Sequence, residues 1–190
     1  MSAPYILRSA RWLAREAMER LIGPGDTVID ATMGNGHDTL YLCSLVGENG
    51  RVEAFDVQQQ AVDNTRALLR ENGMESRATL HLLGHQHMAE VVSGPVRAVM
   101  FNLGWLPGGD KSVTTRWETT ETAIRAALSL LEREGLCIVC VYPGHAAGAE
   151  ELRQIRIMLS SLRPQEFNVL EQCFINAGEG APVCFQIQRQ

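Results

Sequence analysis

Short apolar runs and amphipathic stretches alternate along most of this chain. Runs rich in Val, Ile, Leu and Phe, each bounded by turn-forming residues, predict strands. The predicted strands span residues 27–31, 51–55, 78–82, 96–101, 136–141, 167–174 and 183–188. Apolar residues at helical spacing predict helices over residues 8–21, 38–46, 58–71, 86–92, 117–131 and 150–162.

The order of these elements predicts the fold class. Strand and helix alternate up to residue 162, which requires a parallel sheet with right-handed crossovers and helices on both faces. Two strands then follow with no helix between them, and they predict an antiparallel hairpin at one edge. The expected fold is α/β: a doubly wound, seven-stranded, mostly parallel sheet with an antiparallel C-terminal edge hairpin.

Length and composition add a domain count and a location. The 190 residues favour a single domain, residues 1–190, with residues 1–22 as an N-terminal helical extension. The apolar members of that first helix are Trp12, Leu13, Met18 and Leu21. No apolar run approaches the roughly 20 residues that cross a bilayer, and no signal-peptide apolar region is present. We therefore expect a cytoplasmic protein with no membrane partner.

Charge gives a local signal rather than a global one. The net charge of −5 provides no overall basic field for nucleic acid. Arg8, Arg11 and Arg15 nevertheless share one face of the first helix. That face is either simply solvated or a contact for an RNA backbone.

The cysteines and histidines give little support to a metal site. Cys137 and Cys140 have C-x-x-C spacing but fall in a predicted strand, where side chains three apart point to opposite faces. Zinc binding by His81, His85 and His87 is an alternative, but no carboxylate or cysteine nearby completes a site. We expect buried structural thiols and no metal.

A glycine turn after the first strand predicts a nucleoside-containing cofactor. Residues 28–39 give an apolar strand ending in Asp30, a turn through Gly34 and Gly36, and a helix start. The second strand ends at Asp56, where a carboxylate can bind ribose hydroxyls. Thr39 stands where a dinucleotide site would have its third glycine.

Asp30 favours one cofactor over another. A pyrophosphate at this turn would be repelled by the carboxylate, whereas a sulfonium and an ammonium group would be attracted. S-adenosylmethionine therefore fits better than NAD. The alternatives are that Asp30 caps a helix or loop and that Asp56 caps the following helix. After the third strand, His85 or Gln86 is placed to contact the adenine.

The loop after the fourth strand carries the candidate reaction chemistry. Asn102 and Trp105 match the amide and aromatic that amino-directed methyltransferases place there, although Leu103 and Gly104 replace the usual two prolines. An amide oxygen can aim an acceptor amine, and a flat ring can stack a nucleobase. The alternative for Trp105 is a place in the core.

Three further polar residues are candidates near this loop. Lys111 could pair with a phosphate, or Asp110 could hold it in a loop ion pair. His145, after the fifth strand, could accept the proton of the amine or bond to backbone.

Four segments, residues 28–39, 55–58, 101–115 and 142–145, resemble the bacterial family long labelled rRNA methylases, whose members are regarded as tRNA wobble-uridine methyltransferases. The resemblance spans nearly the whole chain and is most specific over residues 102–115. It implies a Rossmann-like class I fold that depends on S-adenosylmethionine. The implied reaction is N-methylation of the aminomethyl group of wobble 5-aminomethyl-2-thiouridine.

The resemblance also implies site residues and partners. Around the cofactor it implies Asn35, His37, Asp56, Gln58, His85 and Gln86. Facing the modified uridine it implies Asn102, Trp105, Asp110, Lys111 and residues 142–145, including Tyr142 and His145. The expected partner is the anticodon region of tRNA, met through the first helix and a second subunit of a homodimer. The alternatives are an rRNA methyltransferase, a small-molecule or protein N-methyltransferase, and a non-catalytic nucleoside-binding module.

Overall fold

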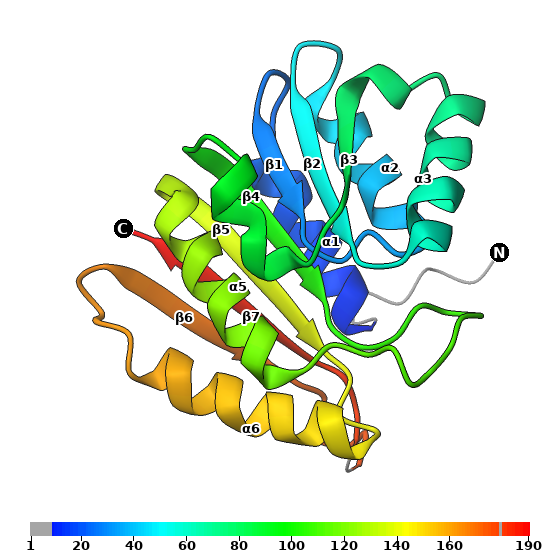
Figure 1. Cartoon of the computed structure of the whole chain (residues 1–190). Helices are drawn as coiled ribbons and strands as arrows, with labels where there is room; N and C mark the ends of the chain where they lie inside the picture. Colours follow the sequence, from blue (N-terminus) through cyan, green and yellow to red (C-terminus); the bar gives the residue numbers. More distant parts are fainter. Residues whose placement is uncertain (1–8, 179) are drawn as a thin grey trace, which may run out of the picture.

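The computed structural model describes residues 9–178 and 180–190 (Figure 1). Its strands are β1 Thr27–Asp30, β2 Arg51–Asp56, β3 Ala78–Leu82, β4 Val96–Asn102, β5 Leu131–Val141, β6 Phe167–Gln172 and β7 Val183–Arg189. Its α-helices are α1 Ala10–Leu21, α2 His37–Val46, α3 Gln59–Glu71, α4 Met88–Val91, α5 Trp117–Leu130 and α6 Ala146–Ser160. Two 3₁₀ turns, η1 Glu75–Arg77 and η2 His85–His87, flank β3.

The seven strands form one sheet in the order β3-β2-β1-β4-β5-β7-β6. Strands β1 to β5 pair in parallel, and β7 pairs antiparallel with both β5 and β6. The predicted fold is confirmed, with β6 as the outer strand of the C-terminal hairpin. The strand order reverses between β1 and β4, and ligands of open α/β sheets bind at such a switch point, outside the carboxyl ends of the strands.

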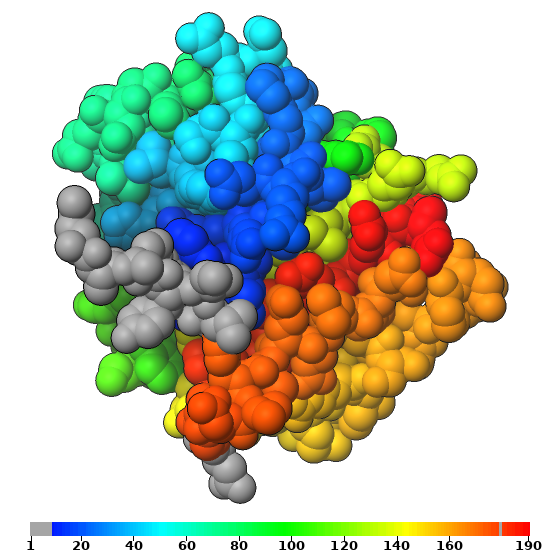
Figure 2. Space-filling model, turned by 180° about the vertical axis from the view of Figure 1, so that it is seen from behind, coloured from blue at the N-terminus to red at the C-terminus, as the bar shows by residue number. Residues whose placement is uncertain are grey.

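Two hydrophobic clusters cover the two faces of the sheet. One joins α4, α5 and α6 to one face, and the other joins α1, α2 and α3 to the opposite face. Figure 2 shows the second face, where α1, in dark blue, lies between the cyan segment and the red and orange C-terminal strands. Cys137 belongs to the first cluster and Cys140 to the second, so the two thiols point to opposite faces as expected. Within the described residues, no group of three or more His, Cys, Asp or Glu could hold a metal ion.

Helix α1 packs against the sheet through one face. Ala10, Ala14 and Met18 are its buried residues, at i, i+4 and i+8, whereas Trp12 is 41% exposed. Small side chains at this spacing let the helix lie close to β4, β5 and β7. The predicted start at Arg8 falls outside the described residues. None of the described helices is long and apolar enough to cross a membrane.

Two predicted boundaries shift for identifiable reasons. Strand β5 starts at Leu131 rather than at residue 136, because five residue steps from Leu131 to Leu136 oppose two steps from Val96 to Ala98 in a bulged register. Helix α6 starts at Ala146 rather than at residue 150, because the His145 side chain caps it by accepting from the Gly148 N–H.

The glycine turn depends on Gly36 in two ways. Gly36 has φ +81°, and a Cβ at this position would lie 2.8 Å from both Cα and Oγ1 of Thr65 on α3. We expect Gly36→Ala to lose roughly 1–2 kcal/mol of unfolding free energy from the positive φ and about 1–3 kcal/mol more from the clash with backbone. Chemical denaturation of the variant measures the sum.

Gly73→Ala is the matched control. Gly73 has φ +68°, and a Cβ there would meet nothing within 4 Å, so the control carries the backbone strain alone. The loss in Gly36→Ala should exceed that in Gly73→Ala. Equal losses would contradict the close approach of the turn to α3.

Candidate active site

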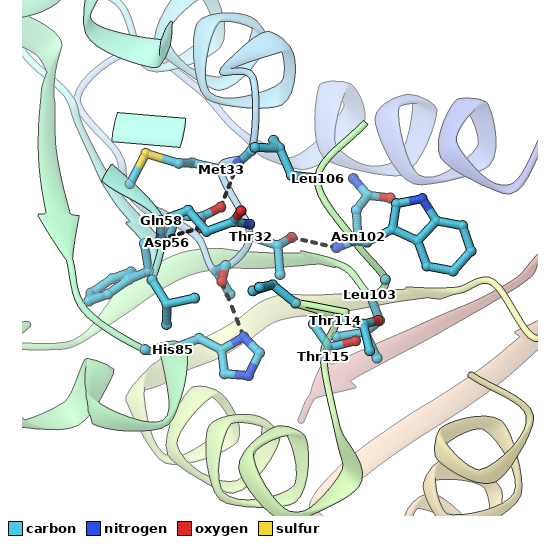
Figure 3. Close-up of a pocket in the computed structure, with 18 of the residues that line it drawn as sticks. Thr32, Met33, Asp56, Gln58, His85, Asn102, Leu103, Leu106, Thr114 and Thr115 are labelled. Atoms are coloured by element: carbon cyan, nitrogen blue, oxygen red, sulfur yellow. Dashed lines mark hydrogen bonds between the residues drawn. The ribbon is translucent and has the colours of Figure 1, made fainter. Parts of the chain in front are cut away.

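A cavity of about 920 Å³ opens at the carboxyl ends of β1, β2 and β4, within the range of small-molecule sites. One part of its wall comes from the ends of β1, β2 and β3 and consists of residues 31–35, 37, 38, 55–58 and 84–86. The other part comes from the segments after β4 and β5 and consists of residues 102–107, 113–116, 118, 119, 142 and 145, with Arg11 of α1 beside them. Figure 3 shows Asp56 and Gln58 on one side of the cavity and Asn102, Thr114 and Thr115 on the other.

Asp56 holds the ends of two loops together. Its Oδ2 accepts from the Gly34 N–H at 3.1 Å, and its Oδ1 accepts from the Gln58 N–H at 2.9 Å. Burial raises the pKa of Asp56, and the two backbone N–H bonds oppose that rise. Each carboxylate oxygen has a second lone pair, so Asp56 can also accept from a pair of vicinal hydroxyls in the cavity.

Asp30 lies beneath the glycine turn and not on the cavity wall. The residue is 1% exposed; its carboxylate accepts from the Thr39 hydroxyl at 2.7 Å and from the Thr32 N–H at 3.2 Å. Burial, followed by the nearby Asp38 carboxylate, raises the pKa of Asp30 to about 7. Through these contacts Asp30 stabilises the glycine turn.

The raised pKa predicts a pH dependence of stability. Because the folded state keeps the proton up to about pH 7 while the unfolded chain releases it near 3.8, the contribution of Asp30 to stability falls as pH rises between these values. The span corresponds to roughly 4 kcal/mol. Relative to the wild type, Asp30→Asn should gain stability from pH 4 to 7 and then level off. Urea unfolding of both proteins across this range tests it; a constant difference would contradict the assignment.

His85 and Gln86 form the wall at the end of β3. The His85 ring is buried, and burial lowers its pKa to about 4, so the ring is neutral at ordinary pH. Its Nδ1 lies 3.3 Å from the Ala31 carbonyl oxygen, which can only accept, so Nδ1 carries the hydrogen and Nε2 keeps a lone pair. The side chain of Gln86 folds back over Gly84 and also lines the cavity.

Asn35 connects the glycine turn to the loop after β4. Its Nδ2 donates to the Pro107 carbonyl at 3.1 Å, and its Oδ1 accepts from Asn64 of α3 at 2.9 Å. Leu106, in the same loop, is 5% exposed and approaches Gly34. His37 is exposed and borders the cavity, whereas Gly36 does not reach it.

Asn102 ends β4 at the centre of the cavity wall. Its backbone N–H donates to the Thr32 hydroxyl at 2.7 Å, which fixes the strand end against β1 (Figure 3). Its side-chain Nδ2 donates to Asp38 Oδ2 at 2.7 Å, and its Oδ1 lies 3.5 Å from the Tyr142 hydroxyl. The cavity thus has a fixed amide whose oxygen is on the Tyr142 side.

Arg11 and Arg15 turn inward rather than forming a free basic stripe. Both guanidinium groups bind the Asp38 carboxylate, at 2.8 Å and 2.7 Å, and Arg15 also covers the Tyr41 ring. Neither an RNA contact nor a solvated face describes these two arginines fully, because both are committed to Asp38. Arg8 lies outside the described residues.

The structure places Trp105 beside His145 but leaves Asp110 and Lys111 off the cavity wall. The centroids of the Trp105 and His145 rings are 4.6 Å apart, and the Lys111 Nζ lies 5.5 Å from the Trp105 centroid. Asp110 is exposed and accepts from the Ser112 N–H, which lowers its pKa. Among the ion pairs of the described residues, none joins Asp110 to Lys111.

The neighbours of His145 determine which of its ring nitrogens carries the hydrogen. Since Nδ1 accepts from the Gly148 N–H at 3.2 Å, the neutral ring carries its hydrogen on Nε2. Nε2 is buried and has no hydrogen-bond partner within the described residues. Proton uptake from an amine would require the capping bond at Nδ1 to break, so the observed geometry suits a donor rather than a base.

Several residues at the site were missed by the sequence analysis. Thr32 and Asp38 follow the predicted turn and helix start, so their place in the motif was a usable signal. Glu151 gave no such signal: its buried carboxylate accepts from Thr115 at 2.8 Å and Thr120 at 2.6 Å and anchors the end of the long loop.

The strand order, the glycine turn and Asp56 at the end of β2 define a Rossmann-like methyltransferase of class I, with S-adenosylmethionine as cofactor. The cavity suits this molecule, because Asp56 can accept from ribose hydroxyls and the neighbouring His85 and Gln86 offer polar atoms to an adenine.

Comparison with known proteins gives the family. Residues 52–188 match the family model described as "Putative rRNA methylase", and the chain belongs to this family of S-adenosylmethionine-dependent methyltransferases. It is 37% identical over 193 residues to the chloroplastic tRNA (mnm(5)s(2)U34)-methyltransferase of Arabidopsis thaliana, covering 96% of this chain and 70% of that protein.

Two solved structures are similar over almost the whole chain. A "putative rRNA-methylase" from Clostridium thermocellum is 40% identical with a TM-score of 0.96, over 98% of this chain and 100% of that one. A "putative methyltransferase" from Streptococcus mutans, solved in complex with SAH, is 33% identical with a TM-score of 0.89, over 97% of this chain and 100% of that one.

Proposed function

We propose that the protein methylates the aminomethyl nitrogen of wobble 5-aminomethyl-2-thiouridine in tRNA. RNA as the substrate class is supported by the names of the family and of the Arabidopsis thaliana relative, which is a tRNA (mnm(5)s(2)U34)-methyltransferase. The observation that carries the proposal is the Asn102 amide, held at the end of β4 with its oxygen beside the Tyr142 hydroxyl.

For an amine acceptor, the enzyme needs to orient the nitrogen rather than to increase its nucleophilicity strongly. When bound, S-adenosylmethionine supplies a methyl group on a positively charged sulfur. The amine nitrogen must direct its lone pair at that methyl carbon while its hydrogens point elsewhere. The Asn102 oxygen can accept one N–H and so fix this direction, and positioning of this kind supplies a large part of catalysis.

Methylation of the amine requires the nitrogen to lose one proton. The nitrogen–carbon bond forms as the carbon–sulfur bond breaks, the sulfur keeps the bonding pair, and the nitrogen becomes positively charged. It returns to neutral by losing a proton to solvent. This route needs no base at His145, whose Nδ1 is already used to cap α6.

The uridine ring would lie beside Trp105. Trp105 is half-buried, lines the cavity and faces the same space as Asn102 and Tyr142. Aromatic side chains commonly hold nucleobases that leave a single-stranded RNA loop, which suits an anticodon. Lys111, exposed near this ring, would pair with the phosphate backbone beyond the cavity.

Labelled methyl transfer to three RNAs tests the proposal. The protein is incubated with methyl-labelled S-adenosylmethionine and either tRNA carrying the wobble aminomethyl group, the same tRNA sequence without modifications, or ribosomal RNA. We expect label in the first RNA alone. Equal label in the unmodified tRNA, or label confined to ribosomal RNA, would contradict the proposed substrate.

A further inference from the structure

The Asn102 amide can work as an aiming group only if its oxygen and its NH₂ keep their places. The C=O and NH₂ groups of an amide have nearly the same shape. Their positions are therefore fixed only by a neighbour that accepts from the NH₂ or donates to the oxygen. Asp38 on α2 does so. Its carboxylate can only accept, and the 2.7 Å contact with Asn102 therefore fixes the NH₂ end on that side. A flipped amide would place two oxygen atoms against each other.

Asp38 is itself held by α1. Arg11 donates through Nε and Nη2, and Arg15 donates through Nε and Nη2, all to the Asp38 carboxylate at 2.7–3.0 Å. The Asp38 side chain is only 10% exposed, so solvent competes weakly for its oxygens. The contact on the other side of the amide agrees, since the Tyr142 hydroxyl can donate to Oδ1 at 3.5 Å.

We propose that Asp38, clamped by Arg11 and Arg15, is a positioning residue that locks the Asn102 amide with its oxygen toward the acceptor amine. The inference rests on the proposed function for the identity of that amine. It makes α1 part of the active site: the helix holds a carboxylate, and the carboxylate orients the group that touches substrate. Asp38 itself does not take part in the bond changes.

The lock predicts opposite effects for single and paired exchanges. In Asp38→Asn, the carbonyl of the new amide is expected to face the two arginines and its NH₂ to face Asn102. Asn102 would then flip and present NH₂ to the substrate, so we expect kcat to fall at least tenfold with little change in cofactor affinity. In Asn102→Asp, two carboxylates would meet at the contact, and kcat should fall roughly 100-fold at pH 8 and recover partly at lower pH.

The double variant Asp38→Asn/Asn102→Asp is the critical test of the proposed role of Asp38. It restores a donor facing an acceptor, with the amide at position 38, and leaves a carboxylate oxygen on the substrate side. We expect its kcat to exceed that of either single variant and its pH profile to return toward that of the wild type. Asp63→Asn, an exposed change on α3, is the matched control and should behave as the wild type does.

If the wild type methylates the modified tRNA but the kcat of the double variant does not exceed that of the better single variant, the lock is overturned while the proposed function stands. Inactive wild-type protein on the modified tRNA would instead count against the proposed function. In that case the lock is read by NMR. The Asn102 side-chain NH₂ signals, identified by their loss in Asn102→Asp, should move in Asp38→Asn and stay in place in Asp63→Asn. Signals that do not move in Asp38→Asn would overturn it.

Discussion

Replacing Asn102 by alanine is expected to lower kcat about 100-fold while cofactor affinity stays near that of the wild type. The amide oxygen is the group that would aim the acceptor nitrogen, and the loss of such aiming costs on this scale. Asp56, Gln58 and His85, the residues proposed to hold the cofactor, lie on a part of the cavity wall that does not include the Asn102 side chain (Figure 3). Single-turnover kinetics together with calorimetric binding of S-adenosylmethionine would separate the two effects.

The control for this substitution is Asn168→Ala, which removes an exposed amide from the outer strand β6. It should leave both kcat and cofactor affinity unchanged. Unchanged turnover in Asn102→Ala would remove this side chain from the mechanism. A large loss of cofactor affinity would give it a different role, as part of the cofactor site.

Replacing Asp56 by alanine is expected to weaken binding of S-adenosylmethionine roughly 10- to 150-fold. Hydrogen bonds to a carboxylate contribute about 1.5–3 kcal/mol, and burial of Asp56 limits competition from water. The substitution also frees the Gly34 and Gln58 N–H groups, which loosens the turn on the same wall. Calorimetric titration with the cofactor measures the change.

Asp56→Asn provides the finer comparison, because it keeps the shape and one accepting oxygen. Its affinity should lie between those of the wild type and Asp56→Ala. Asp63→Ala, an exposed carboxylate on α3, should bind as the wild type does. Full affinity in Asp56→Ala would show that the ribose lies elsewhere.

The fold could be predicted from the sequence because its signals are local and repeated. Each strand is a short apolar run, and each crossover helix has its own periodicity, so the order of elements already implies a doubly wound sheet. The boundaries that shifted depend on contacts from elsewhere. The start of β5 is set by a bulge opposite Val96, and the start of α6 is set by the His145 cap.

The candidate site could be predicted where a residue ends a strand. Asp56 and Asn102 end β2 and β4, and parallel strands bring those ends to one edge. Asp30 was placed at the correct turn, but the sequence could not show that Thr39 and Thr32 would bury its carboxylate beneath the cavity. Partners far apart in sequence decide this kind of detail.

The arginines of α1 are a second case in which distant partners could not be predicted from the sequence. Their helical spacing indicated a shared face, and the sequence left open what that face meets. The structure brings the helix against α2, so Arg11 and Arg15 bind Asp38 and through it reach Asn102. Of this arginine pattern, Arg11 therefore lines the cavity, while Arg15 supports it from behind through Asp38.

The position of the transferred methyl group tests the proposed reaction at the atom where it occurs. Modified tRNA is treated with the protein and S-adenosylmethionine, digested to nucleosides, and analysed by fragmentation mass spectrometry. We expect one added methyl group on the aminomethyl nitrogen of the wobble nucleoside. A methyl group on a ring atom, on the sulfur or on a ribose hydroxyl would contradict it.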